Sequence, residues 1–104
     1  MNNNFYNNKI ITFRKKINNL TQNESFQLFK LYKLVYSNIE KKTKRKYNKI
    51  ENLLNNYSEV IFFTINNIIF GGFVLKKIIN KINKISIILH SNDKYSKQYV
   101  YDIL

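Results

Sequence analysis

The chain has 104 residues and a formal net charge of +12 at pH 7, and it contains no cysteine. This length allows one domain, and a hydrophobic content of 44% is enough to form a core. The absence of cysteine excludes disulfide bonds, thiol catalysis and cysteine-ligated metal sites.

The composition is dominated by Asn, Lys, Ile, Phe and Tyr, whose codons are rich in A and T. This bias indicates an AT-rich genome, such as that of an organelle or a large DNA virus. The positive charge therefore has two interpretations, an anionic partner or the accumulation of lysine through codon bias. No apolar run approaches the roughly 18 to 20 residues of a membrane-spanning helix, and the N-terminus lacks the apolar core of a signal peptide. We expect a soluble, intracellular protein without a membrane span.

The first half of the chain predicts a strand followed by a helix. Residues 1–8 predict a disordered polar N-terminus, before a single domain of residues 9–104. The segment "KIITFRKKI" is typical of a short strand, because it mixes β-branched and aromatic residues. Thr21 followed by Glu24 has the spacing of a capping box and predicts a helix start. The apolar face of this helix is predicted from helical spacing and is widened by aromatic residues: Leu28, Leu31, Tyr32, Val35 and Ile39, with Phe26, Phe29 and Tyr36 beside them.

A basic run, "EKKTKRKYNK", comes next. From Tyr47 onward, apolar residues at Ile50, Leu54 and Tyr57 recur at helical spacing and predict a shorter second helix.

The second half reads as a meander of three strands and a closing helix. The runs "EVIFFTI" and "IIFGGFVLKKI" are joined by Asn66-Asn67, which fits a tight hairpin because Asn tolerates positive φ. Gly71-Gly72 predicts a bulge or a close backbone approach. The segment "INKIN" predicts a further turn, and "KISIILH" predicts the third strand.

The last segment, "SNDKYSKQYVYDIL", predicts a helix capped by Ser91, Asn92 or Asp93, with an apolar face of Tyr95, Tyr99 and Ile103. The predicted order is therefore β-α-α-β-β-β-α. The expected fold class is α+β, with a mostly antiparallel sheet and helices packed on it.

This order resembles the N-terminal part of the GNAT superfamily of acyl-CoA N-acyltransferases. The segment "VIFFTINNIIFGGFVLKK" resembles the family's hairpin, with Gly72 at its usual glycine position, and "ISIILHSNDKY" is similar to its central strand and turn up to Tyr95. The resemblance departs from the family after Tyr95, because the glycine-rich loop that holds the acyl-CoA pyrophosphate is absent. The family's remaining strands also have no counterpart before Leu104. The resemblance therefore implies a shortened or degenerate acyltransferase-like domain with an unknown acceptor.

The resemblance also implies where acetyl-CoA or another acyl-CoA would bind. The backbone of the central strand would pair with the pantetheine arm, and the segment after Tyr95 would take the pyrophosphate position. The implied cofactor-binding residues are Ile87, Ile88, Leu89, Ser96, Lys97, Gln98, Tyr99 and Val100.

Catalytic candidates are few. His90, the single histidine, and Glu59 are candidates for a general base, although a half-exposed structural histidine and a surface turn glutamate are the simpler interpretations. The carboxylates show no spacing that would hold a metal ion, so we expect no metal cofactor.

Two alternatives do not require catalysis by this chain alone. The first is a non-enzymatic RNA-associated or ribosomal-type protein, with the densest basic patch, Lys41, Lys42, Lys44, Arg45, Lys46 and Lys49, contacting nucleic acid. The second is a homodimer or a partner chain that completes the sheet beside "ISIILH", because exposed strand edges invite pairing.

Overall fold

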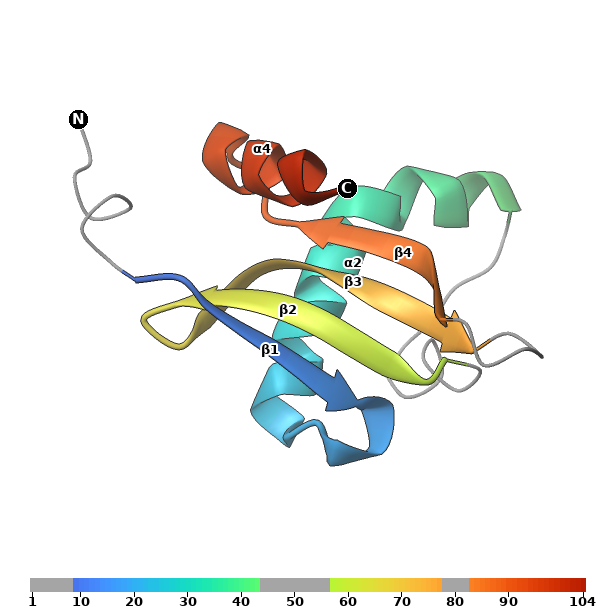
Figure 1. The fold of residues 1–104 in the computed structure, drawn as a ribbon. Helices are drawn as coiled ribbons and strands as arrows, with labels where there is room; N and C mark the ends of the chain where they lie inside the picture. The colour runs from blue at the N-terminus through green and yellow to red at the C-terminus, as the bar shows by residue number, and fades with distance from the viewer. Residues whose placement is uncertain (1–8, 44–56, 78–82) are drawn as a thin grey trace.

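The computed structural model describes residues 9–43, 57–77 and 83–104. The described residues form a four-stranded antiparallel sheet in the order β1-β2-β3-β4 and two α-helices (Figure 1). The elements are β1 (Ile11–Lys16), the 3-10 helix η1 (Ile17–Asn19), α2 (Gln22–Thr43), β2 (Glu59–Ile65), β3 (Ile68–Lys77), β4 (Asn83–His90) and α4 (Lys94–Ile103). The α+β class and the antiparallel sheet are confirmed.

Several predictions concern residues outside these ranges. They are the polar tail 1–8, the second helix before Tyr57, residues 79–82 of the predicted turn 79–83 and the basic residues 44–49. Asn83, the last residue of that predicted turn, begins β4 instead. Lys41 and Lys42, the first two residues of the predicted basic patch, belong to the last turn of α2.

The start of α2 is fixed by the predicted capping box. The Glu24 N–H donates to Thr21 Oγ1 at 3.1 Å, and the Thr21 N–H donates to Glu24 Oε1 at 2.8 Å. These two bonds satisfy amide groups that a helix start otherwise leaves without partners. Lys15 Nζ also donates to Glu24 Oε2 at 2.8 Å, which ties the end of β1 to the first turn of α2.

The β2–β3 hairpin turns on Asn66 and Asn67, as predicted. Their φ angles are 51° and 65°, the left-handed conformation that both central residues of a type I′ turn require. Beyond the turn, Thr64 pairs with Ile69 and Phe63 pairs with Gly71, so Phe70 is the extra residue of a β-bulge. This bulge lies directly before the glycine pair that predicted an irregularity.

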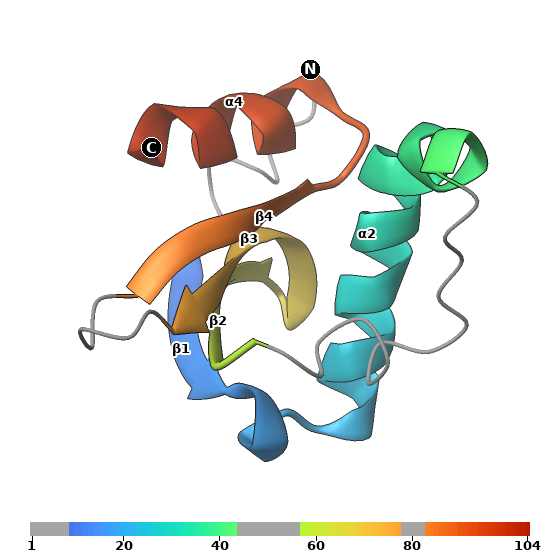
Figure 2. The same cartoon turned by 90° about the vertical axis from the view of Figure 1, so that its right-hand side faces the viewer.

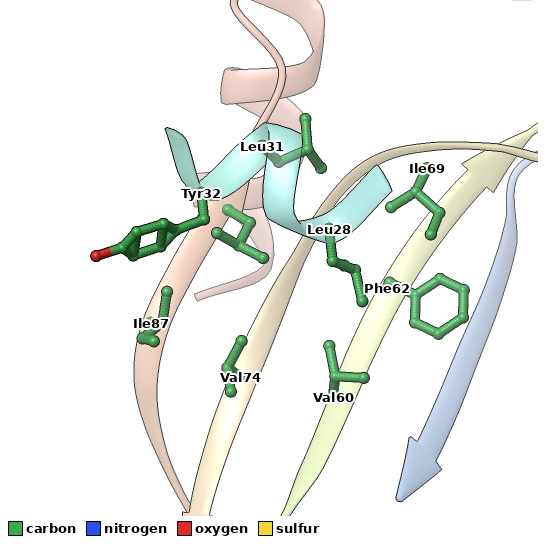
Figure 3. Packing of buried hydrophobic residues seen from close by; sticks show 9 residues of the cluster. Leu28, Leu31, Tyr32, Val60, Phe62, Ile69, Val74 and Ile87 are labelled. Carbon is green, nitrogen blue, oxygen red and sulfur yellow. The ribbon is translucent and has the colours of Figure 1, made fainter. Parts of the chain in front are cut away.

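One face of the sheet packs against α2. The buried cluster on this face includes side chains from α2 and from β2, β3 and β4 (Figure 3). Its members are Leu28, Leu31, Tyr32, Val60, Phe62, Ile69, Val74, Ile87 and Leu89. Phe26 was expected to widen the face of α2 that packs on the sheet, but it is 63% exposed. The reason is geometric, because Phe26 is half a turn away from Leu28 around the helix.

The opposite face of the sheet packs against α4. Strand alternation places Phe63 and Phe73 in a second buried cluster on this face, and Val100 of α4 completes it. Figure 2 shows α2 beside the sheet and α4 above the end of β4. The sheet is therefore a middle layer with a hydrophobic cluster on each side.

The face of α4 that packs on the sheet includes Tyr99, as predicted, but differs from the predicted face on either side of it. Val100 and Ser96 are buried, at 0% and 2% exposed, whereas Tyr95 and Ile103 are about half exposed. The cause lies in the sheet: a Cβ atom at Gly71 would approach Val100 Cγ2 to less than 3.0 Å. The missing side chain of Gly71 makes room for Val100, and this contact sets the rotation of the helix.

Within the described ranges, no helix is both long enough and apolar enough to span a membrane.

Candidate functional site

The candidate site is the β4–α4 junction, residues 87–100, where an edge strand leads into a helix. In the sheet order, β4 has β3 on one side and no described strand on the other. Only three residues separate the end of β4 from the start of α4. The junction therefore places an open strand edge next to a helix N-terminus (Figure 1).

The peptide groups of β4 alternate between β3 and the open edge. The Ser91 N–H donates to the Phe70 carbonyl at 2.8 Å, so Ser91 faces β3. Because hydrogen-bonded positions alternate along an antiparallel pair, Leu89 and Ile87 also face β3, whereas His90 and Ile88 face the open edge. The side chains of Ile87 and Leu89 are buried against α2, so a ligand at this edge would meet backbone atoms rather than these side chains.

Tyr36 of α2 already forms a hydrogen bond with one of the outward peptide groups. The Ile88 N–H donates to Tyr36 Oη at 3.2 Å. The Tyr36 ring stacks on Tyr32, with centroids 5.2 Å apart, and Tyr32 is buried in the core. The core thus holds the hydroxyl at the strand edge. The sequence assigned Tyr36 to an apolar helix face, and helical spacing carries no signal of this polar contact.

Asp93 occupies the N-terminus of α4. Its Oδ1 atom accepts from the Ser96 N–H at 2.8 Å, and its Oδ2 atom accepts from Ser91 Oγ at 2.6 Å and from Ser96 Oγ at 2.8 Å. The two hydroxyl oxygens also lie 2.7 Å apart. Of the three cap candidates, Asp93 is therefore the N-cap residue, and Ser91 joins it by binding its carboxylate.

The Asp93 carboxylate is stabilised in its charged form. Loss of hydration around the carboxyl group raises its pKa, but the hydrogen bonds from Ser91 and Ser96 outweigh this effect and hold the pKa below its usual range. A negative charge is thus fixed where a helix N-terminus would otherwise attract a bound anion.

The segment that was expected at the pyrophosphate position, residues 96–100, lies in α4, so some of its side chains are buried and others are exposed. Ser96 and Val100 point into the protein, and Tyr99 packs edge-on against Phe63, with ring centroids 5.2 Å apart. Lys97 and Gln98 are exposed. Only the exposed residues can meet a ligand with their side chains.

The structure does not bring the two catalytic candidates together. His90 pairs with Gly71 at one end of β3, and Glu59 pairs with Leu75 further along the same strand. The His90 Nδ1 atom lies 3.0 Å from the carbonyl oxygen of Ser91, and its ring lies 5.8 Å from that of Tyr101. Glu59 accepts hydrogen bonds from Arg14 Nε and Nη2, at 2.8 and 2.6 Å. The His90 ring therefore contacts the backbone of Ser91, a member of the Ser91–Asp93–Ser96 cluster, whereas Glu59 is paired with Arg14 of β1.

The part of the chain that the structure describes contains no group of three or more His, Cys, Asp or Glu residues that could hold a metal ion. Comparisons with known proteins found no matching family model, no matching curated protein and no matching solved structure.

Proposed function

We propose that this chain forms an acyl-CoA N-acyltransferase-like domain with a degenerate cofactor site at the β4–α4 junction. The observation that supports this proposal is the placement of an open strand edge directly before a helix N-terminus. An extended amide chain can pair with the outward peptide groups of such an edge. A phosphate group at its end would meet the positive end of the helix dipole. The acyl acceptor stays unassigned.

Two groups of the chain itself compete with an acyl-CoA molecule on this path. The Tyr36 hydroxyl accepts a hydrogen bond from the outward N–H of Ile88, and the Asp93 carboxylate accepts one from the Ser96 N–H in the first turn of α4. Lys94 and Lys97 are exposed in the first turn and favour an anion, whereas Asp93 repels it. We therefore propose weak binding of acyl-CoA by the native chain.

The test is a calorimetric titration of CoA into the native chain and two charge variants. In Asp93→Asn the helix keeps a good N-cap residue, because Asn and Asp cap equally well, but the negative charge is removed. Like charges about 4 Å apart in water repel by about 1 kcal/mol, so we expect affinity for CoA to rise about fivefold. Asp102→Asn is the matched control, because it removes the same charge near the other end of the same helix.

Two results would contradict the proposal. An absence of CoA binding by all three proteins at millimolar ligand would reject a cofactor site in this chain. An equal gain in affinity for Asp93→Asn and Asp102→Asn would show a general charge effect rather than a phosphate at the start of α4.

The net charge of +12 favours a second candidate function, a non-enzymatic RNA-associated protein. The predicted contacts are the basic residues from Lys41 to Lys49. Binding of a uridine oligonucleotide should weaken steeply with salt and should weaken further when these residues are changed to Gln. An absence of oligonucleotide binding at low ionic strength would reject this function.

A further inference from the structure

The two edges of the sheet are not equivalent. In the strand order β1-β2-β3-β4, the edge strands are β1 and β4. The edge of β4 is partly closed, because Tyr36 binds the Ile88 N–H. The peptide groups on the outer edge of β1 have no hydrogen-bond partner among the described residues.

The outward peptide groups of β1 can be assigned from its pairing with β2. The Ile17 N–H donates to the Ser58 carbonyl at 3.1 Å, so Ile17 faces β2. By the alternation of an antiparallel pair, the peptide groups of Thr12, Arg14 and Lys16 face away from β2. The outer edge of β1 therefore offers three N–H and three C=O groups to an added strand.

The side chains of β1 give this edge two different faces. Ile11 and Phe13 point to the α2 side of the sheet and are 49% and 38% exposed. The Phe13 ring stacks on the buried Phe62 ring, with centroids 5.3 Å apart, which holds it flat against the sheet. Arg14 and Lys16 point to the other side, because they pair with residues of that face in the β1–β2 register. The α2 side of the edge is apolar along Ile11 and Phe13 and ends at Lys15, which is paired with Glu24 of α2, and the other side is basic.

The charges around the outer edge of β1 indicate what kind of strand could pair with it. Arg14 is paired with Glu59, but Lys16 has no ion-pair partner in the described part of the chain. A second copy would bring another net charge of +12 and its own basic edge, and like charges opposite each other destabilise a strand pair. An added strand with carboxylates opposite Arg14 and Lys16, and apolar residues opposite Ile11 and Phe13, matches both faces.

We propose that the outer edge of β1 is a docking site for an extended segment of another protein in which apolar and acidic residues alternate. The segment adds a fifth strand to the sheet beside β1. Backbone hydrogen bonds to Thr12, Arg14 and Lys16 supply affinity, and the alternation of side chains supplies specificity.

The test uses fluorescein-labelled peptides of about eight residues, close to a typical strand length. One peptide alternates valine and glutamate, and its matched control carries lysine in place of every glutamate. Fluorescence anisotropy at about 150 mM salt suppresses long-range attraction between exposed charges. We expect the native chain to bind the glutamate peptide and not the lysine peptide. We also expect the amides of Thr12, Arg14 and Lys16 to become protected from hydrogen exchange.

Two matched pairs of variants locate the site. Thr12→Pro removes an outward N–H, and proline is tolerated on a strand edge where the N–H faces solvent, whereas Thr12→Ala keeps the N–H. We expect Thr12→Pro to weaken peptide binding about tenfold, and Thr12→Ala to leave it nearly unchanged. Lys16→Glu should weaken binding more than Lys30→Glu, which makes the same charge change on the exposed side of α2.

Several results would overturn this inference. They are equal binding of both peptides, no binding of either, and unchanged binding by Thr12→Pro. The edge would be assigned to a second copy of the chain if the three amides were protected without peptide and sedimentation showed self-association. It would be assigned to nucleic acid if a uridine oligonucleotide protected them. None of these results depends on whether the β4–α4 junction binds CoA.

Discussion

Gly71 is the residue on which the position of α4 depends most directly. A Cβ atom there would meet Val100 Cγ2 at less than 3.0 Å, and the Leu89 carbonyl oxygen at 3.1 Å. Val100 is fully buried, so its side chain cannot relieve the contact by turning into solvent. We expect Gly71→Ala to lower the free energy of unfolding by about 2 kcal/mol through overpacking, as measured by urea denaturation.

A double-mutant cycle separates this contact from other effects of the added methyl group. In a Val100→Ala background, the cost of Gly71→Ala should fall by about 1 kcal/mol, because the clashing methyl groups are gone. Gly72 is the matched control: a Cβ atom there would meet the backbone of Ile61 and Phe62, which Val100→Ala does not relieve. Equal costs in both backgrounds would show that Gly71 is not required by α4.

The polar residues of the candidate site show which contacts can be predicted from a local sequence pattern and which cannot. Asp93 was one of three cap candidates because a cap acts on residues of its own helix. Tyr36 was not identified, because its hydroxyl binds an N–H group 52 residues away in the chain. No local pattern reports on such a contact. The side-chain environment of Ser96 and Val100 was likewise decided by the sheet rather than by their neighbours in sequence.

At the scale of elements, the predictions that hold are those with a local cause. The capping box starts α2, the Asn66-Asn67 pair forms the hairpin, and the Ile- and Phe-rich runs form β2, β3 and β4. The apolar face of α4 was predicted correctly at Tyr99 but wrongly at Tyr95 and Ile103. Helical spacing gives several alternative apolar stripes in this segment, and the contact with Gly71 selects the one that contains Val100.

The β2–β3 hairpin gives a prediction at this scale. Asn67 has a φ of 65°, a conformation that costs glycine nothing and that asparagine tolerates. Asn67→Gly should raise the free energy of unfolding by about 0.5 kcal/mol, because the gain in turn geometry exceeds the entropy that glycine adds to the unfolded chain. Asn67→Val should lower it by about 1 to 2 kcal/mol, because a β-branched residue is strained in the left-handed region. Thermal unfolding of both variants checks this, and a stable Asn67→Val protein would show that the turn adopts another conformation.

At the scale of the whole molecule, the sheet separates two hydrophobic clusters, and the surface around them carries a large excess of positive charge. The chain has 18 Lys and Arg residues and 6 Asp and Glu residues. The carboxylates are few, but three of them hold elements together. Glu24 binds Lys15 and Thr21, and Glu59 binds Arg14. Asp93 binds Ser91 and Ser96. The fold therefore depends on its acidic residues more than their number suggests.

This dependence predicts unfolding in mild acid. Loss of hydration raises the pKa of Glu24, but the hydrogen bonds from Lys15 and Thr21 outweigh it, so its pKa in the folded protein lies below the ordinary value of 4.5. The pKa of Asp93 is likewise below its ordinary value of 3.8. A carboxyl group with a lowered pKa in the folded state contributes stability that is present above its unfolded pKa and is lost as the pH falls through its folded pKa.

Stability should thus be constant from neutral pH to about 5 and should then fall steadily as the pH decreases. Repulsion reinforces the loss, because protonation of all 6 carboxyl groups leaves the 18 positive charges of Lys and Arg without opposing charges. Urea denaturation midpoints measured across this range test the prediction, with the Glu24→Gln/Asp93→Asn double variant as the comparison. The variant should be less stable at pH 7 and should show a flatter decline, because two of the titrating groups are gone. A double variant whose midpoint falls as steeply as that of the native chain would show that repulsion alone drives the acid transition.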